Sequence, residues 1–243
     1  MRCTQPPSSA GELSRSALKL LMEYLIRIDR LLLKWAYQKP FKESISIKAL
    51  IFMGDGPFWM LVVFVAAFTG QLTNIKSFYQ LSILLMFGLM ISNIVFILCK
   101  TKVKRKRPYA NFELQRHLQI EIKNRDPGHG SKELESFPSG HVLWTTLCVC
   151  LIYSQFGYIS LILFGWMIPA MVYLRLYLGV HYPSDVLASL ALGSVNVFIT
   201  LLLATGLMEY LNGLRNNTGF LVGYWVFIII FLIVGFKSWL KRV

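Results

Sequence analysis

Uncharged stretches divide this chain into long apolar segments separated by polar ones. Five runs lack Asp, Glu, Lys and Arg: 56–75, 77–99, 142–174, 186–208 and 216–236. A helix that crosses a bilayer needs roughly 20 mostly apolar residues. The run 142–174 is too long for one such helix, and Gln155-Phe156-Gly157 within it predicts a tight turn. We therefore expect two helices there, the first of which begins at Ser139.

These segments predict an all-α fold, a polytopic membrane helix bundle with about six transmembrane helices. The expected spans are about 47–70, 77–99, 139–156, 158–177, 183–208 and 218–238. Only helices and closed β-barrels satisfy their backbone hydrogen bonds inside a bilayer, and runs of this length exclude barrel strands. The pattern indicates no soluble domain and no internal repeat, and residues 1–16 lack the apolar core of a cleavable signal peptide.

The N-terminal segment 16–35 has a different pattern, typical of an amphipathic helix. At 100° per residue its charged residues fall within one stripe about 80° wide. They are Lys19, Glu23, Arg27, Arg30 and Lys34. Such a helix either lies in the membrane interface or packs on the bundle. Asp29 lies off the stripe, which leaves two interpretations: it pairs with a basic residue of the bundle, or it sits at the interface.

The formal net charge of +13 is concentrated on one side of the expected bundle. Nine Lys and Arg precede residue 49, and ten more lie between residues 100 and 132. Six spans place the N-terminus, the 101–137 loop, the 175–183 turn and the C-terminus on one membrane face. A strongly basic face attracts anionic headgroups and phosphates. We therefore expect membrane lipids as partners of this face. No nucleic acid is expected as a partner.

Three polar clusters at the ends of spans carry the candidate chemistry. The first, KTKVKRKRP, contains Lys100 and Arg107; the second is Pro138-Ser139-Gly140-His141; the third contains Arg175, His181 and Asp185. All three reach the basic face in the six-span arrangement. Two histidines, a carboxylate and several cations suit phosphoryl transfer, whose transition state spreads negative charge over three oxygens.

Each cluster also has a purely structural interpretation. A basic run beside a span is commonly a topology signal. Ser139 could be a plain helix N-cap, His181 an interfacial histidine, and Arg175 a side chain that reaches toward the headgroups. The spacing of all three clusters together favours the functional interpretation.

With these motifs the chain resembles the type 2 phosphatidic acid phosphatase (PAP2) superfamily of membrane lipid phosphatases. The family signature is K-x6-R-P, P-S-G-H and S-R-x5-H-x3-D. Lys100 to Pro108, residues 138–141, and Arg175 to Asp185 match these spacings, and Leu174 replaces the Ser before the Arg. The stretch 54–56 (Gly-Asp-Gly) is also similar to one common in these proteins. The expected division is an interfacial segment 1–46, a PAP2-like catalytic domain 47–208 that includes the 101–137 active-site loop, and an additional span in 209–243.

The resemblance implies that His181 is a nucleophile that forms a phosphohistidine and that Asp185 orients its ring. We expect His141 to protonate the leaving oxygen, because a His gives or takes a proton near neutral pH. The phosphoryl oxygens would be held by cations and by the N-terminus of the helix that starts here, where free N–H groups favour phosphate. These phosphate-binding residues are Lys100, Arg107, Ser139, Gly140 and Arg175. No metal or other cofactor is expected.

The expected function is hydrolysis of a lipid phosphate or diphosphate. A lipid phosphotransferase would use the same residues, so the sequence leaves this alternative open. A non-catalytic transporter is the third interpretation, disfavoured because no ionisable residue lies in the middle of a span. We expect the 101–137 loop to rim the headgroup pocket, with His117 and His129 solvated rather than catalytic.

Two arguments conflict about which side of the membrane the site faces. Lys and Arg normally mark the cytoplasmic side, and most of them lie on the active-site face. Resemblance implies instead a periplasmic, extracellular or lumenal site. Since phosphate binding accounts for several of the cations, we expect an integral protein of the bacterial inner membrane with its site facing the periplasm; a cytoplasmic-facing site is the alternative.

Cys3 tests this orientation, because six spans put the N-terminus on the same side as the site. In spheroplasts, a membrane-impermeant maleimide should label Cys3 before lysis. The control is labelling of the same protein in detergent, which shows that the thiol is accessible. Labelling only after permeabilisation would place the site in the cytoplasm.

Overall fold

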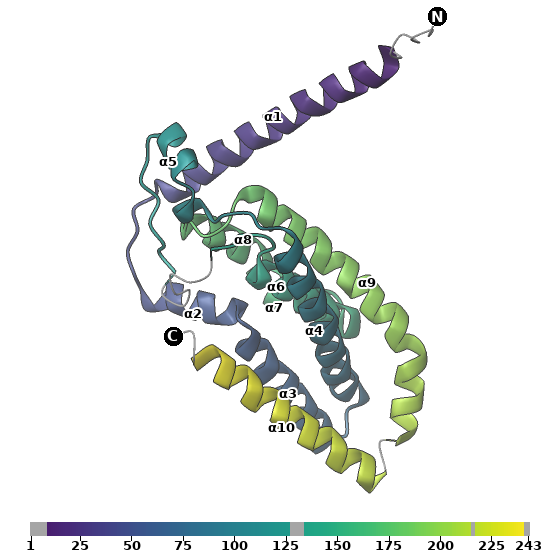
Figure 1. Cartoon of the computed structure of the whole chain (residues 1–243). Coiled ribbons are helices and arrows are strands. Elements are labelled where there is room, and N and C mark those ends of the chain that lie inside the picture. The colour runs from purple at the N-terminus through teal and green to yellow at the C-terminus, as the bar shows by residue number, and fades with distance from the viewer. Residues whose placement is uncertain (1–8, 127–133, 215–216, 241–243) are drawn as a thin grey trace, which may run out of the picture.

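A computed structural model describes residues 9–126, 134–214 and 217–240, which form helices joined by loops (Figure 1). Cys3 and His129 lie outside the described residues. The elements are α1 (Ser9–Tyr37), α2 (Ile45–Gly54), α3 (Gly56–Thr73), α4 (Lys76–Lys102), the 3-10 helix η1 (Pro108–Ala110), α5 (Phe112–Leu118), α6 (Gly140–Phe156), α7 (Tyr158–Phe164), α8 (Met167–Tyr177), α9 (Pro183–Gly213) and α10 (Thr218–Leu240).

Helix α6 is the centre of the bundle. It packs against α4, α8 and α9, and most of its side chains are buried. The main apolar core joins its Leu143, Leu147 and Leu151 to residues of α3 and α4 such as Trp59 and Leu85. Helix α10 covers α3 from outside (Figure 1). This arrangement confirms the predicted all-α membrane helix bundle.

Among the described residues, five helical segments are long and apolar enough to cross a membrane. They are Gly56–Thr73, Lys76–Lys102, Tyr158–Tyr177, Pro183–Leu211 and Thr218–Lys237. Helix α6 is apolar but has only 17 residues, which is short for a complete span. The chain is thus an integral membrane protein, and the count of six spans stays a prediction.

The expected single helix over 47–70 is wrong, because the chain breaks at Asp55. This residue has extended backbone angles (φ −81°, ψ 155°) and separates α2 from α3. Pro57 stands in the first turn of α3, where its missing N–H costs nothing. Within a continuous helix the same proline would clash with the preceding turn. The break turns Asp55 from a mid-helix residue into one at a helix junction.

The predicted helix over 158–177 is also divided, into α7 and α8, although together they have the length of one span. Pro169 cannot donate a hydrogen bond to the carbonyl of Gly165. That carbonyl accepts instead from the N–H of Ile168 at 3.3 Å, which is a tighter turn. The predicted turn after Phe156 is confirmed, with Gly157 at φ 66°.

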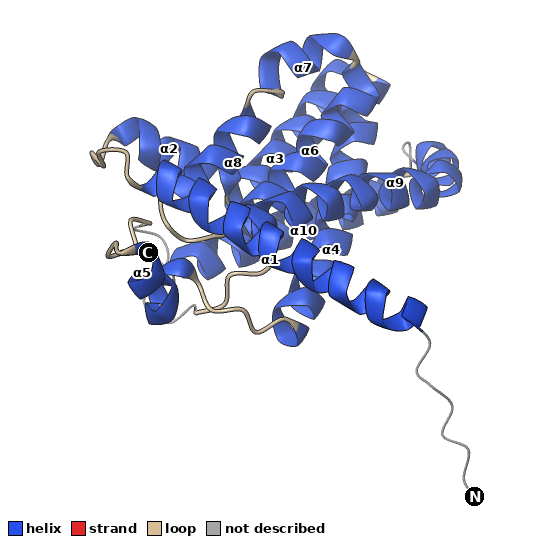
Figure 2. Cartoon of the chain, turned by 90° about the horizontal axis from the view of Figure 1, so that it is seen from above, coloured by secondary structure: helices blue, strands red, loops and turns tan. Residues whose placement is uncertain are grey.

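The predicted amphipathic helix is confirmed as α1, which is longer than expected. Its N-terminal part projects away from the bundle (Figures 1 and 2), with Leu20 and Tyr24 exposed. Its C-terminal part packs against α5, α8 and α9 and buries Leu33 and Ala36. Asp29 is buried and pairs with a basic residue of the bundle, the first of its two predicted interpretations.

Helices α6 and α9 are in close contact at Gly193, which predicts that a larger residue there would destabilise the protein. A Cβ atom there would meet the Cβ of Thr146 at 2.9 Å and the carbonyl of Leu143 at 3.0 Å. Gly193→Ala should therefore cost about 1–3 kcal/mol of stability through overpacking. Gly206→Ala on the same helix is the control, since nothing lies within 4 Å of its Cβ position. Thermal unfolding in detergent should show a lower midpoint for Gly193→Ala alone; equal midpoints would contradict the packing.

Candidate active site

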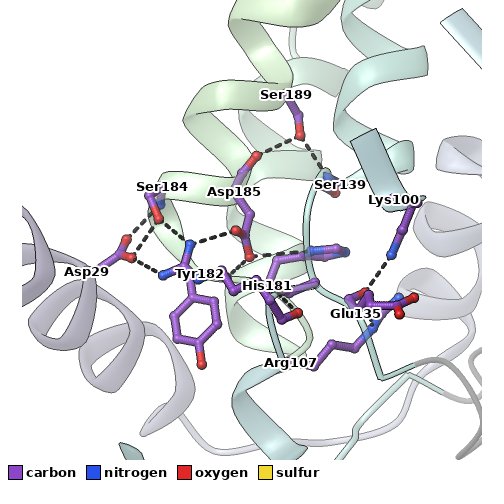
Figure 3. A network of polar contacts seen from close by, with 12 residues as sticks. Asp29, Lys100, Arg107, Glu135, Ser139, His181, Tyr182, Ser184, Asp185 and Ser189 are labelled. Atoms are coloured by element: carbon purple, nitrogen blue, oxygen red, sulfur yellow. Dashed lines mark hydrogen bonds and ion pairs between the residues drawn. The ribbon is translucent and has the colours of Figure 1, made fainter. Parts of the chain in front are cut away.

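The three polar clusters of the sequence meet at one end of the bundle. Lys100 lies in the last turn of α4, Arg107 precedes η1, and Arg175 lies in the last turn of α8. Figure 3 shows Lys100 and Arg107 on one side of His181 and Asp185, with Ser139 beside them. Six of the predicted side chains are at most 4% exposed: Arg107, Ser139, His141, Arg175, His181 and Asp185. These six residues form a polar centre that the fold shields from solvent, and Lys100 is partly exposed at its edge.

Lys100 and Arg107 converge on one backbone oxygen. The carbonyl of Glu135 accepts from Nζ of Lys100 at 2.5 Å and from Nε of Arg107 at 3.1 Å. The basic run is also tied to the end of the 101–137 loop, because the N–H of Arg107 donates to the carbonyl of Leu134 at 2.8 Å. This pairing holds two cations, seven residues apart in the chain, close together.

Arg175 is held by a carboxylate that the sequence analysis missed. Its Nη1 donates to Oδ2 of Asp126 at 2.7 Å, and both side chains are completely buried. Its Nε and Nη2 have no hydrogen-bond partner within the described part of the chain. Buried donors of this kind are normally satisfied, so they mark a place for an anionic ligand. Asp126 carried no sequence signal beyond its position in a long polar loop.

The first turn of α6 differs in detail from the expectation. Ser139 is the N-cap residue, as predicted, but its side chain makes no capping hydrogen bond. Its N–H, expected to be open to phosphate, donates to Oγ of Ser189 at 2.8 Å. The N–H of Gly140 has no acceptor within the helix, because it stands at the helix start. Oγ of Ser139 is buried without a hydrogen-bond partner among the described residues.

His141 faces the break between α2 and α3. Oδ1 of Asp55 lies 3.1 Å from its Nε2, and both side chains are largely buried. The sequence pointed to Asp55 only through the Gly-Asp-Gly resemblance, and the structure assigns it this contact.

His181 and Asp185 lie together, but less closely than expected. Their Nδ1 and Oδ2 atoms are 3.9 Å apart, which is an ion-pair distance rather than a hydrogen bond. Oδ2 of Asp185 accepts instead from the N–H of Tyr182 at 2.9 Å, and Oδ1 accepts from Arg105 at 2.7 Å. As predicted, α9 begins at Pro183 and has Asp185 in its first turn.

Arg105 is a further residue that the sequence analysis missed. Burial lowers the pKa of its guanidinium, but the nearby Asp185 and Asp29 carboxylates raise that pKa by more, so the group stays charged. The sequence does not distinguish Arg105 from its neighbours, because it is one of six cations between positions 100 and 107 and lacks the family spacing.

The described residues contain no group of three His, Cys, Asp or Glu side chains that could hold a metal ion. Lys100, Arg107 and Arg175 are the cations that the motifs contribute to the site. Together with His141 and His181, they have the charge and the proton-transfer groups that phosphoryl chemistry requires.

Comparison with known proteins places the chain in a family. A sequence profile described as the PAP2 superfamily matches residues 81–208. Decaprenylphosphoryl-5-phosphoribose phosphatase of Mycobacterium tuberculosis, from strains CDC 1551 / Oshkosh and ATCC 25618 / H37Rv, is 34% identical over 107 residues, which are 44% of this chain. The match spans about half (52%) of those relatives' length.

Two solved structures share the fold. LpxE of Aquifex aeolicus superposes with a TM-score of 0.53 at 20% identity, over 72% of this chain and 93% of that one. The transmembrane PAP2-type phosphatidylglycerolphosphate phosphatase of Bacillus subtilis has a TM-score of 0.56 at 17% identity, over 77% and 87% of the two chains. At these identities the likeness concerns the fold.

The position of the basic residues generates a prediction about phosphate affinity. Lys100→Ala and Arg107→Ala should each weaken binding of inorganic phosphate roughly ten- to hundredfold, since each removes a charge-assisted contact. Lys104→Ala is the matched control, because Lys104 is exposed in the same run. Titration calorimetry in detergent measures all three; a loss in Lys104→Ala equal to that in Lys100→Ala would overturn the assignment.

Proposed function

The chain belongs to the PAP2 superfamily, and from this premise we propose that it is an integral-membrane lipid phosphatase. It would hydrolyse a phosphomonoester or diphosphate on a lipid headgroup through a phosphohistidine on His181. One observation carries the proposal. Arg107 and Arg175 are buried, as are His141 and His181, at the end of the apolar bundle where the three motifs meet.

In the proposed first step, Nε2 of His181 attacks phosphorus while the bond from phosphorus to the lipid oxygen breaks. Nε2 is the attacking atom because Nδ1 faces Asp185. The leaving oxygen takes a proton from His141, whose Nε2 lies 3.1 Å from Oδ1 of Asp55. Lys100, Arg107 and Arg175 neutralise the charge that develops on the phosphoryl oxygens.

In the second step, water attacks the phosphohistidine and the bond from phosphorus to nitrogen breaks. His141, now neutral, takes the proton of the attacking water, so the enzyme returns to its first state. Asp185 favours the positive charge on His181 in the intermediate through its carboxylate at 3.9 Å. Three fixed cations supply charge neutralisation, so the proposed reaction needs no metal.

The substrate class follows from the surroundings of the site. Apolar helices flank it, so the leaving group is the alcohol or phosphate of a membrane lipid. The similar proteins include a decaprenylphosphoryl-5-phosphoribose phosphatase and a phosphatidylglycerolphosphate phosphatase, which is consistent with this class. A phosphotransferase would use the same first step with another acceptor, and product analysis separates the two.

We also propose that the site faces the periplasm of a bacterial inner membrane. The charge argument for the opposite orientation weakens because several cations of the basic face have partners within the site. Lys100 and Arg107 share the Glu135 carbonyl, and Arg175 pairs with Asp126.

His181→Ala should abolish phosphate release from a panel of lipid phosphates in detergent that contains EDTA. In the proposed mechanism His181 is the nucleophile, and no other side chain takes that role. Wild-type protein quenched rapidly with radiolabelled substrate should hold an acid-labile, base-stable adduct, and His181→Ala should hold none. Full activity of His181→Ala, or loss of wild-type activity in EDTA, would contradict the proposed mechanism.

A further inference from the structure

We propose that Arg105 and Asp29 are positioning residues for Asp185, so that the N-terminal helix α1 is part of the active-site framework. The inference rests on the proposed function, because it gives Asp185 a role in the reaction of His181. Arg105 stands at a variable position of the first sequence motif, and Asp29 lies outside all three.

Arg105 joins two carboxylates that lie on different helices. Its Nη1 donates to Oδ1 of Asp185 on α9, and its Nη2 donates to Oδ2 of Asp29 on α1, both at 2.7 Å. Its guanidinium also stacks on the ring of Tyr182, with its central carbon 3.8 Å from the ring centroid. A planar guanidinium held on two edges and one face has little freedom to move. Arg105 is thus a rigid link between α1 and the carboxylate beside His181.

Asp29 also caps the helix that carries Asp185. Its Oδ1 accepts from the N–H of Ser184 at 2.7 Å, and its Oδ2 accepts from the Ser184 hydroxyl at 2.6 Å (Figure 3). The N–H of Ser184 lies in the first turn of α9, where it has no acceptor within the helix. A residue of α1 therefore performs the capping that usually comes from the residue before a helix. This contact fixes the turn in which Asp185 stands.

The link leaves Asp185 with one defined orientation. Its Oδ1 is held by Arg105 and its Oδ2 by the N–H of Tyr182, so the carboxylate cannot rotate without losing a hydrogen bond. In this orientation Oδ2 faces Nδ1 of His181. Without Arg105, the fully buried carboxylate would lose the hydrogen bond that holds its Oδ1, and the N–H of Tyr182 alone would have to fix its orientation.

The sharing of Arg105 has an electrostatic consequence. One guanidinium faces two carboxylates, so these three groups carry a net charge of −1 when all are ionised. Asp185 is therefore only partly neutralised and keeps its attraction for a positively charged His181 ring. If Asp29 lost its charge, Arg105 would neutralise Asp185 more completely, and the stabilisation of the charged intermediate would fall.

Burial shows that α1 is firmly placed at this point. Asp29 is 6% exposed, and Leu33 and Ala36, one and two turns further along, are fully buried. Nζ of Lys34 adds a hydrogen bond to the carbonyl of Leu118 on α5, at 3.1 Å. The contact of α1 with the site is thus part of a packed interface.

Asp29→Asn in the full-length protein tests the inference. An asparagine keeps an oxygen that can cap Ser184, because Asn is as good an N-cap as Asp, but removes the charge that faces Arg105. We expect kcat for a lipid phosphate to fall roughly 10- to 100-fold with KM within about twofold, since misplaced catalytic groups affect the chemical step. Glu23→Gln is the matched control: the same change of charge at an exposed position of the same helix should leave kcat unchanged.

Arg105→Gln and the double variant with Asp29→Asn complete the experiment. Because Asp29 acts through Arg105, Asp29→Asn should lower kcat little further once Arg105 is replaced. A kcat of Asp29→Asn equal to that of Glu23→Gln, a change confined to KM, or fully additive losses would each overturn the inference. If Arg105→Gln does not fold, the first pair of variants still decides it.

The His181→Ala variant distinguishes failure of the proposed function from failure of the inference about α1. If it retains activity, the proposed function itself fails. If it is inactive while Asp29→Asn is fully active, only the inference about α1 fails.

Discussion

Charged side chains buried at the end of an apolar bundle are the constraint on which this structure depends. Arg107, Arg175 and Asp185 are each at most 1% exposed, and an isolated charge at such a depth costs several kcal/mol. Each must therefore meet opposite charge or hydrogen-bond partners from the protein. Asp126 supplies a partner for Arg175, Arg105 for Asp185, and the Glu135 carbonyl for Arg107.

Because each buried charge requires a partner, distant parts of the chain come together at the site. Asp29 comes from α1, whose N-terminal part extends away from the bundle, and Asp126 comes from the long polar loop. Asp55 comes from the junction between α2 and α3, where the helix break frees it to face His141. Segments far from the three motifs in the sequence thus support the residues of the candidate site.

The hydrogen bonding of the Arg175 guanidinium is incomplete. Arg175 uses one of its nitrogens for Asp126 and has two further buried donors without a hydrogen-bond partner among the residues described. A fully paired guanidinium would be more stable but would have nothing to offer a phosphate. The arrangement therefore orients the cation and still leaves part of it for a ligand.

Sequence alone determined the apolar helices and the grouping of the candidate site residues, because both follow from local features. Long uncharged runs predict helices of the right class, and the spacing within three short motifs groups Lys100, Arg107, His141, Arg175 and His181. The tertiary structure decided which carboxylate meets which cation. Arg175 and Asp126 are 49 residues apart, and Arg105 and Asp29 are 76 apart. An aspartate carries no local mark of a distant partner, since that contact is set by how helices pack, and only the packed bundle shows it.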